Sequence, residues 1–183
     1  LLHGSTISSD FIRKFEALAQ ARGYALLAVT NRNGYYWTEV DEAAVLDAMG
    51  MLQQRCPIDA GRVFVGGGSA GGHTAYGFAL THRNRFKGCF AFCGRLNPSV
   101  TDEEVAGAKD MPVFIMLGAE DKLVSRKSVE EGKARLEKAG ARVAFHLMEG
   151  AGHDLLRNPE HVRLLFDWLA EVDAPPAADC PLP

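Results

Sequence analysis

The sequence contains no apolar run long enough to span a membrane, although 47% of its 183 residues are hydrophobic. It also lacks a charge excess of either sign, because 20 basic residues are scattered among 23 acidic ones and the net charge is −3. This distribution provides no basic patch that could bind nucleic acid or anionic lipid. We therefore expect neither a nucleic-acid partner nor a membrane span. The length suits one domain with a sizeable core.

Cysteine is scarce, with four residues, and none is spaced with histidine as a metal site requires (Cys56, Cys89, Cys93 and Cys180). Cys89 and Cys93 fall in one apolar run, KGCFAFCG. Four residues apart on a strand, their Cα atoms would be roughly 13 Å apart, too far for a disulfide. We expect both to be buried free thiols.

A start methionine is also absent, since the chain begins LLHG at the end of what reads as a strand. We expect an upstream segment that supplies further strands. A signal peptide would lie in that upstream segment, so its absence here does not indicate where the protein is located, and the localisation stays open.

Segments typical of strands and of helices alternate along the chain. Most of the predicted strands are apolar throughout, which is typical of a parallel sheet covered on both faces. The sequence therefore predicts an α/β fold, a doubly wound, mostly parallel sheet with helices on both faces. One domain would cover residues 1–174, followed by a proline-rich tail at 175–183. The predicted strands are 24–30, 62–66, 86–92, 111–118 and 141–149, and the predicted helices are 11–22, 38–55, 73–83, 125–140 and 158–172.

The glycine-rich stretch VFVGGGSAGG, residues 63–72, matches two motifs. Gly66-x-Gly68-x-x-Gly71 resembles a dinucleotide-binding turn, which requires a carboxylate about 20 residues later, after the next strand. The residues at that point, 93–96, include no acid. A phosphate-binding P-loop is excluded because His73 stands where a lysine is needed.

The alternative, Gly67-x-Ser69-x-Gly71, is the sharp turn that presents a nucleophilic serine. A serine hydroxyl needs a base, and the base needs a carboxylate to orient it. The second predicted strand after Ser69 ends in LGAED and supplies Asp121, with Glu120 as its neighbouring competitor. The third ends in MEGAGHD and supplies His153. Because parallel strands end at one edge of a sheet, these groups should converge.

This order of serine, acid and histidine resembles the α/β-hydrolase family over essentially the whole chain, from His3 onward. The phrases IDAGRVFVGGGSAGG and GYALLAV resemble its esterase branch, which includes polyhydroxybutyrate depolymerases and feruloyl and acetylxylan esterases. Prolyl oligopeptidases and dienelactone hydrolases are neighbouring branches. The resemblance implies an oxyanion hole formed by the backbone N–H groups of Ala70 and Ser5. Gly68 departs from the pattern, because relatives carry a larger residue before the serine.

The sequence thus predicts a serine esterase with Ser69 as nucleophile, His153 as base and Asp121 as orienting acid, without a cofactor or a metal. Tyr36 and Trp37 follow a predicted strand at the active edge, where they would line a substrate pocket or simply pack beneath the loop. The connection 95–110 is too short for a large lid, so we expect an open site that admits bulky or polymer-attached esters. The expected partner is an ester substrate, either a small molecule or attached to a polymer. A peptidase of the prolyl-oligopeptidase type and a non-catalytic binding domain remain alternatives.

Overall fold

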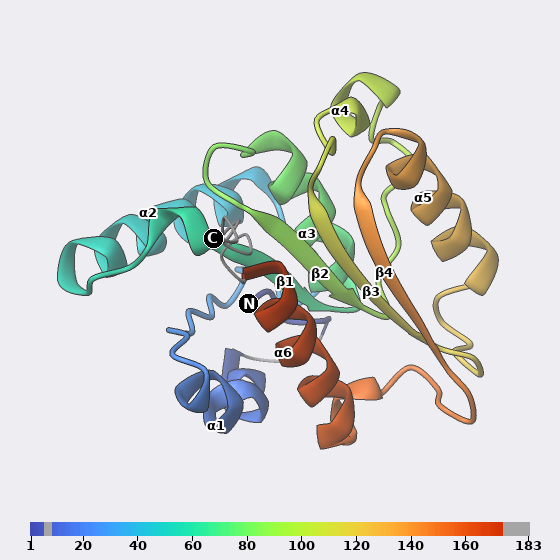
Figure 1. Ribbon diagram of the computed structural model, residues 1–183, viewed down its shortest axis with the longest axis horizontal. Coiled ribbons are helices and arrows are strands. Elements are labelled where there is room, and N and C mark those ends of the chain that lie inside the picture. Colours follow the sequence, from blue (N-terminus) through green and yellow to red (C-terminus); the bar gives the residue numbers. More distant parts are fainter. Residues whose placement is uncertain (6–8, 174–183) are drawn as a thin grey trace, which may run out of the picture.

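A computed structural model describes residues 1–5 and 9–173 and contains a four-stranded parallel sheet (Figure 1). The strands lie in the order β1-β2-β3-β4. Each falls within a run that the sequence predicts as a strand, to within two residues at either end. Parallel pairing brings all four carboxyl ends to one edge of the sheet. The strands are β1 (Phe64–Gly68), β2 (Gly88–Phe92), β3 (Pro112–Gly118) and β4 (Arg142–Met148).

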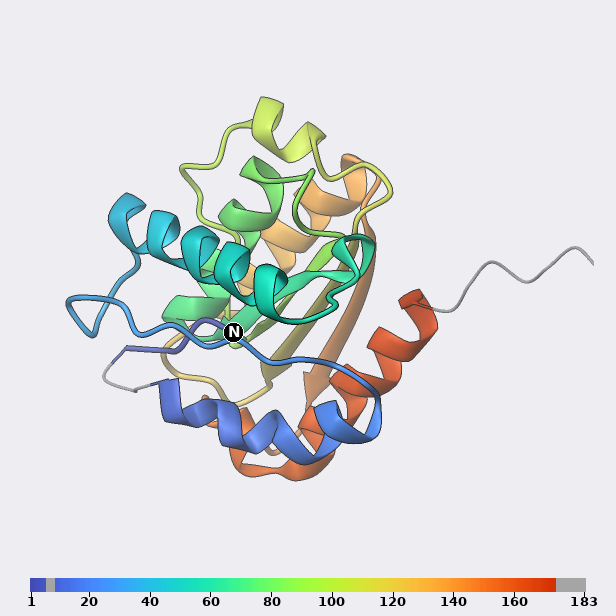
Figure 2. The ribbon, with the colours of Figure 1, turned by 90° about the vertical axis from the view of Figure 1, so that its left-hand side faces the viewer.

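Helices cover both faces of this sheet, as Figure 2 shows. Helices α1 (Arg13–Ala21) and α6 (Pro159–Asp173) pack together on one face. Helices α3 (Ala70–Thr81) and α5 (Arg126–Lys138) cover the other, where α2 (Glu39–Arg55) and the short α4 (Asp102–Ala106) also lie. The predicted doubly wound α/β architecture is confirmed. None of the helices in the described ranges has the length and apolarity needed to cross a membrane.

An aromatic layer joins the sheet to α1 and α6. The ring of Trp168 lies 5.9 Å from that of Phe64 and 5.5 Å from that of Phe114. On the α1 side, the ring of Phe15 lies 6.3 Å from that of Phe92. Such edge and tilted contacts add to the burial of large apolar surfaces, so this layer fixes the two helices on the sheet.

Reciprocal capping boxes fix the starts of two of the described helices. Thr38 and Asp41 form a reciprocal capping box at the start of α2, and Thr101 and Glu104 form another at the start of α4. Each box satisfies backbone N–H groups that a helix start leaves without partners.

The predicted strand at 24–30 is wrong as an extended element. Only Val29 forms a bridge, to Leu2, which also bridges Gly67 of β1. A strand requires backbone partners along its length, and within the described residues Leu2 is the single bridging partner of this segment. The predicted tail at 175–183 lies outside the described residues.

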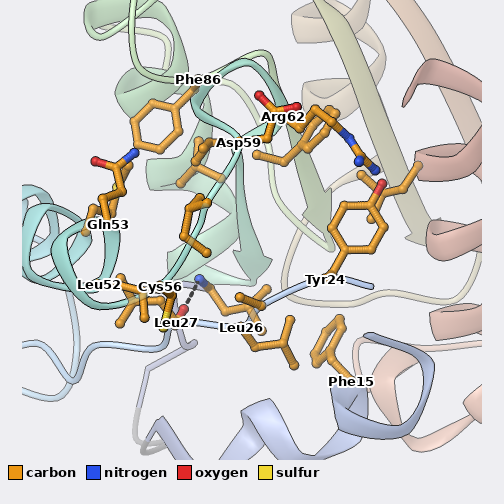
Figure 3. Close-up of a pocket in the computed structure, with 18 of the residues that line it drawn as sticks. Phe15, Tyr24, Leu26, Leu27, Leu52, Gln53, Cys56, Asp59, Arg62 and Phe86 are labelled. Carbon is orange, nitrogen blue, oxygen red and sulfur yellow. Dashed lines mark hydrogen bonds between the residues drawn. The ribbon is translucent and has the colours of Figure 1, made fainter. Parts of the chain in front are cut away.

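A largely apolar cavity of about 460 Å³ separates this segment from β1 (Figure 3). It lies toward the amino end of β1, away from the edge where the candidate catalytic residues are found. Ser69, Asp121 and His153 do not line it. Its walls include Phe15, Tyr24, Leu26, Leu27, Val65 and Phe166.

Candidate active site

Ser69 occupies the turn between β1 and α3 in a conformation that non-glycine residues rarely adopt, with φ 52° and ψ −119°. Hydrogen bonds hold it on both sides. Its N–H donates to the carbonyl of Phe92 at 2.8 Å, and its carbonyl accepts from the N–H of His73 at 2.9 Å. Strain of this kind persists only where the surroundings enforce it, and such strain is concentrated at functional sites. The predicted sharp turn is therefore present.

Two glycines allow the N-terminal segment to approach this turn. A Cβ atom at position 67 would lie 1.9 Å from the carbonyl oxygen of Leu2, and one at position 71 would lie 2.0 Å from the same atom. The group nearest to both glycines is thus the backbone of Leu2, directly before His3 and Gly4. Gly66 has a separate packing role, because a Cβ there would lie 2.3 Å from the ring of Phe90.

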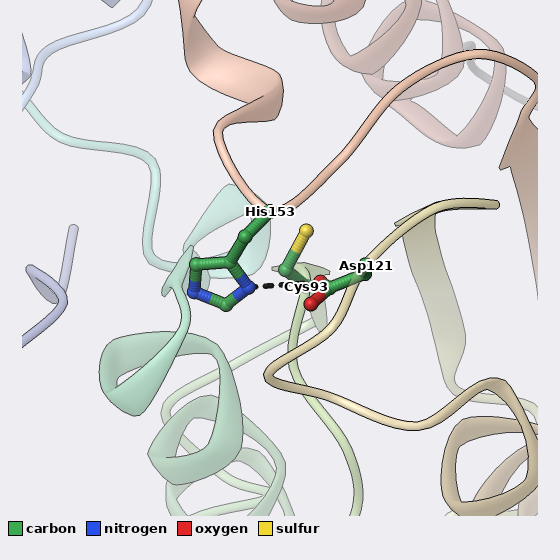
Figure 4. A group of neighbouring side chains, drawn as sticks. All are labelled: Cys93, Asp121 and His153. Atoms are coloured by element: carbon green, nitrogen blue, oxygen red, sulfur yellow. Dashed lines mark hydrogen bonds and ion pairs between the residues drawn. The ribbon is translucent and has the colours of Figure 1, made fainter.

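Asp121 and His153 form a direct pair, shown in Figure 4, with Nδ1 of the imidazole 2.8 Å from Oδ2 of the carboxylate. Asp121 follows β3 and His153 follows β4. The two loops are joined by a hydrogen bond from the N–H of Glu120 to the carbonyl of Ala151 at 2.9 Å. The exposed side chain of Glu120 takes no part in the pair. The structure therefore favours Asp121 over its neighbour as the partner of the histidine.

Backbone amides fix the Asp121 carboxylate. Its Oδ1 accepts from the N–H groups of Leu123 at 2.8 Å and Val124 at 3.0 Å, which leaves Oδ2 for His153. Burial raises the pKa of Asp121, but hydrogen bonds from Val124, His153 and Leu123 outweigh burial, and the net pKa is lowered. The carboxylate is therefore ionised at neutral pH and holds the Nδ1–H tautomer of His153. Nε2 is left free to accept a proton.

Cys93, directly after β2, places a thiol beside this pair (Figure 4). Its backbone is left-handed, with φ 49°, and its N–H donates to the carbonyl of Met116 at 2.8 Å. Burial, together with the hydrogen bond to Asp121, raises the pKa of the Cys93 thiol to about 12. Cys93 is a free, buried thiol as predicted. Sequence reasoning missed its position at the site, although it follows a strand at the same edge as the other candidates.

Ser69 shares the edge with the Asp–His pair but makes no hydrogen bond to it among the described residues. Leu156, three residues after His153, places its Cδ1 3.7 Å from where a Cβ at Gly68 would lie, so the histidine loop packs on the turn. The pKa of His73, in the first turn of α3, is lowered, chiefly by burial. Catalytic hydrogen bonds are often long in unliganded enzymes and shorten on substrate binding.

The loop that carries the predicted Ser5 donor is anchored by His3, which is fully buried. Its Nε2 accepts from the N–H of Asn31 at 3.0 Å, so Nδ1 carries the proton and donates to the carbonyl of Gly4 at 2.7 Å. The hydroxyl of Ser5 donates to the carbonyl of Tyr35 at 2.7 Å. These contacts hold residues 3–5 against the segment 31–35.

The two predicted substrate-binding aromatics differ in their surroundings. Tyr36 is 70% exposed beside the exposed Tyr35. Trp37 is partly buried, with its Nε1–H donating to the carbonyl of His3 at 3.1 Å and its ring 5.2 Å from the His3 ring. Trp37 therefore packs beneath the loop, the alternative that the sequence left open. A substrate contact for Tyr36 stays a prediction.

Known proteins provide three kinds of comparison. The profile of the phospholipase/carboxylesterase family matches residues 39–162. No curated protein matches the sequence. TT1662 from Thermus thermophilus has a similar fold, with a TM-score of 0.75 at 21% identity over 95% of this chain and 88% of that one.

Two further solved structures share the fold. A phospholipase/carboxylesterase from Dyadobacter fermentans has a TM-score of 0.74 at 19% identity, covering 92% of this chain and 87% of the other. An S-formylglutathione hydrolase from Agrobacterium tumefaciens has a TM-score of 0.68 at 18% identity, covering 93% of this chain and 82% of the other. At these identities the structures establish the fold, whereas the family match extends over most of the chain. The chain therefore belongs to the phospholipase/carboxylesterase family of the α/β-hydrolase superfamily.

Proposed function

We propose that this family member is a serine esterase in which Ser69, His153 and Asp121 act as a catalytic triad. The observation that carries the proposal is the 2.8 Å Asp121–His153 pair at the sheet edge where Ser69 stands in its strained turn. Each group comes from a different loop, and the three share one edge because the strands are parallel. A structural role for one of them would not require the other two at the same place.

The chemistry begins when Nε2 of His153 takes the proton of Ser69 and the serine oxygen attacks the ester carbonyl. Asp121 stabilises the imidazolium that forms. When the tetrahedral intermediate collapses, the bond to the alcohol oxygen breaks and His153 gives the alcohol its proton. Water, deprotonated by His153, then attacks the acyl-enzyme. The bond between the acyl carbon and the Ser69 oxygen breaks, the carboxylic acid leaves, and His153 returns the proton to the serine oxygen.

The developing oxyanion requires preorganised donors, and we assign these to the backbone N–H groups of Ala70 and Ser5. Ala70 is the first residue of α3, where helical N–H groups lack intrahelical acceptors. A Cβ at Gly71 would lie 2.8 Å from the carbonyl oxygen of His3, so the segment 3–5 runs beside that helix start. Each donor contributes about 3 kcal/mol of transition-state stabilisation in hydrolases of this type.

A fluorophosphonate probe tests the nucleophile directly, because it phosphonylates an activated serine oxygen. The folded wild-type chain should be labelled at Ser69, and Ser69→Ala should lose both the label and the hydrolysis of short aryl esters. Ser99→Ala, which removes an exposed hydroxyl away from the site, serves as the matched control. Labelling that persists in Ser69→Ala, or a folded wild-type chain that takes no label, would refute the proposal.

The substrate bond is tested with an aryl ester, a thioester and an anilide that carry the same acyl group. The thioester is included because one structural neighbour is named an S-formylglutathione hydrolase. We expect the ester to be cleaved with the highest kcat/KM. Faster cleavage of the anilide would favour the peptidase alternative. Failure to cleave any of the three, together with no labelling, would favour a binding domain.

A further inference from the structure

Three different metal-binding side chains meet at the carboxyl edge of the sheet. The thiol of Cys93, a carboxylate oxygen of Asp121 and an imidazole nitrogen of His153 all lie within 4.8 Å of one another. They come from the loops after β2, β3 and β4 (Figure 4). In the ranges 1–5 and 9–173, this is the one group of three such residues that the structure brings together. The esterase mechanism uses two of them and leaves the thiol unexplained.

This donor set suits a divalent ion of intermediate softness. Zn²⁺ binds cysteine sulfur at about 2.3 Å and histidine nitrogen or carboxylate oxygen at about 2.0 Å. Three donors around one tetrahedral ion are therefore separated by roughly 3.3 to 3.5 Å, so no pair of donor atoms would have to move together by more than about 1.5 Å. Alkaline-earth ions, which prefer oxygen donors only, fit it poorly.

Charge and access also favour a cation. The Asp121 carboxylate supplies one buried negative charge, and the thiolate that forms as a metal binds supplies a second, so the two donors together offset the charge of a divalent ion. The side chain of Asp121 is only 1% exposed, whereas that of His153 is 26% exposed. An ion can therefore reach the two buried donors past the histidine, which is also the ligand best able to move.

We propose that Cys93, Asp121 and His153 form a Zn²⁺-binding site and that the bound ion inhibits the enzyme. The thiol releases its proton to solvent as the Zn–S bond forms. Coordination through Nδ1 of His153 replaces its hydrogen bond to Asp121, so the neutral imidazole carries its proton on Nε2. Nε2 then cannot accept the proton of Ser69. The inhibition rests on the proposed triad, but the binding of the ion does not.

Binding is measured first, on the full, untagged Ser69→Ala chain, so that the result does not depend on activity. Calorimetry with Zn²⁺ should give one equivalent per chain. Co²⁺ should produce a thiolate charge-transfer band and the absorption of a tetrahedral ion. Adding Cys93→Ser should weaken Zn²⁺ binding at least about tenfold and abolish the thiolate band. Cys56→Ser, which removes an exposed thiol outside the cluster, should change neither.

Inhibition is measured next, on the active chain. Zn²⁺ should abolish ester hydrolysis with an apparent constant equal to its binding constant, and a chelator should restore it. Asp121→Asn, in the Ser69→Ala chain, gives a second test of ligation if Cys93→Ser fails to fold, and it should weaken binding by a similar factor. Circular dichroism establishes that each variant is folded.

Each outcome is decisive. The proposal is overturned if Zn²⁺ shows no saturable binding, if folded Cys93→Ser and Asp121→Asn bind it as tightly as their parent, or if the loaded enzyme still turns over esters. A chain that binds Zn²⁺ through Cys93 but hydrolyses no ester when metal-free would support the site and refute the esterase proposal.

Discussion

The carbonyl oxygen of Leu2 lies 2.0 Å from where a Cβ atom at Gly71 would be. Two segments almost 70 residues apart are thus in backbone contact at the serine turn, and glycine at position 71 is what permits the contact. This contact holds the loop with His3, Gly4 and Ser5 beside the start of α3. The proposed nucleophile and the proposed second oxyanion donor depend on it together.

Gly71→Ala should therefore destabilise the fold by about 3 kcal/mol and lower esterase activity, because the new methyl group meets backbone that cannot rotate away. Gly77→Ala is the matched control in the same helix, since nothing lies within 4 Å of a Cβ there. It should stabilise the protein by roughly 0.5 to 1 kcal/mol through helix propensity. Urea unfolding of both variants measures the difference, and equal stability of the two would contradict the packing argument.

Asp121→Asn should reduce kcat about 10⁴-fold while leaving the fold intact. The amide no longer holds the Nδ1–H tautomer of His153, and it no longer stabilises the imidazolium. Glu120→Gln, one residue earlier and exposed, should keep nearly full activity. Steady-state kinetics on an aryl ester separate them. A large loss of kcat in Glu120→Gln, with little effect in Asp121→Asn, would instead assign the orienting role to Glu120.

Asp173 makes the stability of the fold sensitive to acid. Its side chain, 4% exposed, accepts hydrogen bonds from Lys87 at 2.8 Å and from Arg62 at 3.0 Å, and also bonds Tyr24. Burial raises the pKa of Asp173, but the bonds from Lys87, Tyr24 and Arg62 outweigh burial and lower it. Because the pKa is lower in the folded state, this stabilisation is complete above the unfolded value of about 3.9 and is lost as the pH falls through the folded value.

Asp173→Asn should therefore cost about 2 kcal/mol at pH 7 and show a weaker loss of stability on acidification than the wild type. Urea unfolding across the acid range measures both effects. Asp167→Asn is the control on the same helix, because the Asp167 pair with Arg22 is partly exposed and should contribute less than about 1 kcal/mol. If the free energy of unfolding falls equally with pH in the wild type and in Asp173→Asn, this carboxylate is not the source of the acid sensitivity.

Tyr36→Ala should raise KM for bulky aryl esters roughly two- to tenfold without changing stability, since the exposed ring can contact substrate but supports little of the core. Trp37→Phe should instead lower stability and kcat together, because it removes the hydrogen bond to the carbonyl of His3. Met51→Ala, another exposed apolar residue, should leave kinetics unchanged. An unaltered KM in Tyr36→Ala over a range of acyl and alcohol groups would remove it from the substrate site.

The order of elements follows from local features of the sequence. Apolar runs of strand length, and residues such as Thr38 that cap helices, act through nearest neighbours in the chain and can be read without a structure. Parallel strands end at one edge, so the meeting of Asp121 and His153 could also be predicted. The packing role of Gly66 could not, because it depends on which residue of β2 faces it.

The sequence by itself therefore determined the fold class, the serine turn and the two loops that supply the acid and the histidine. Tertiary structure alone decided that 24–28 pairs with no strand in the described chain, that Trp37 packs on His3, and that the Cys93 thiol lies beside Asp121. The physical reason is that these three results depend on partners distant in sequence. Backbone pairing, ring packing and the convergence of donor atoms are fixed only when separate elements meet.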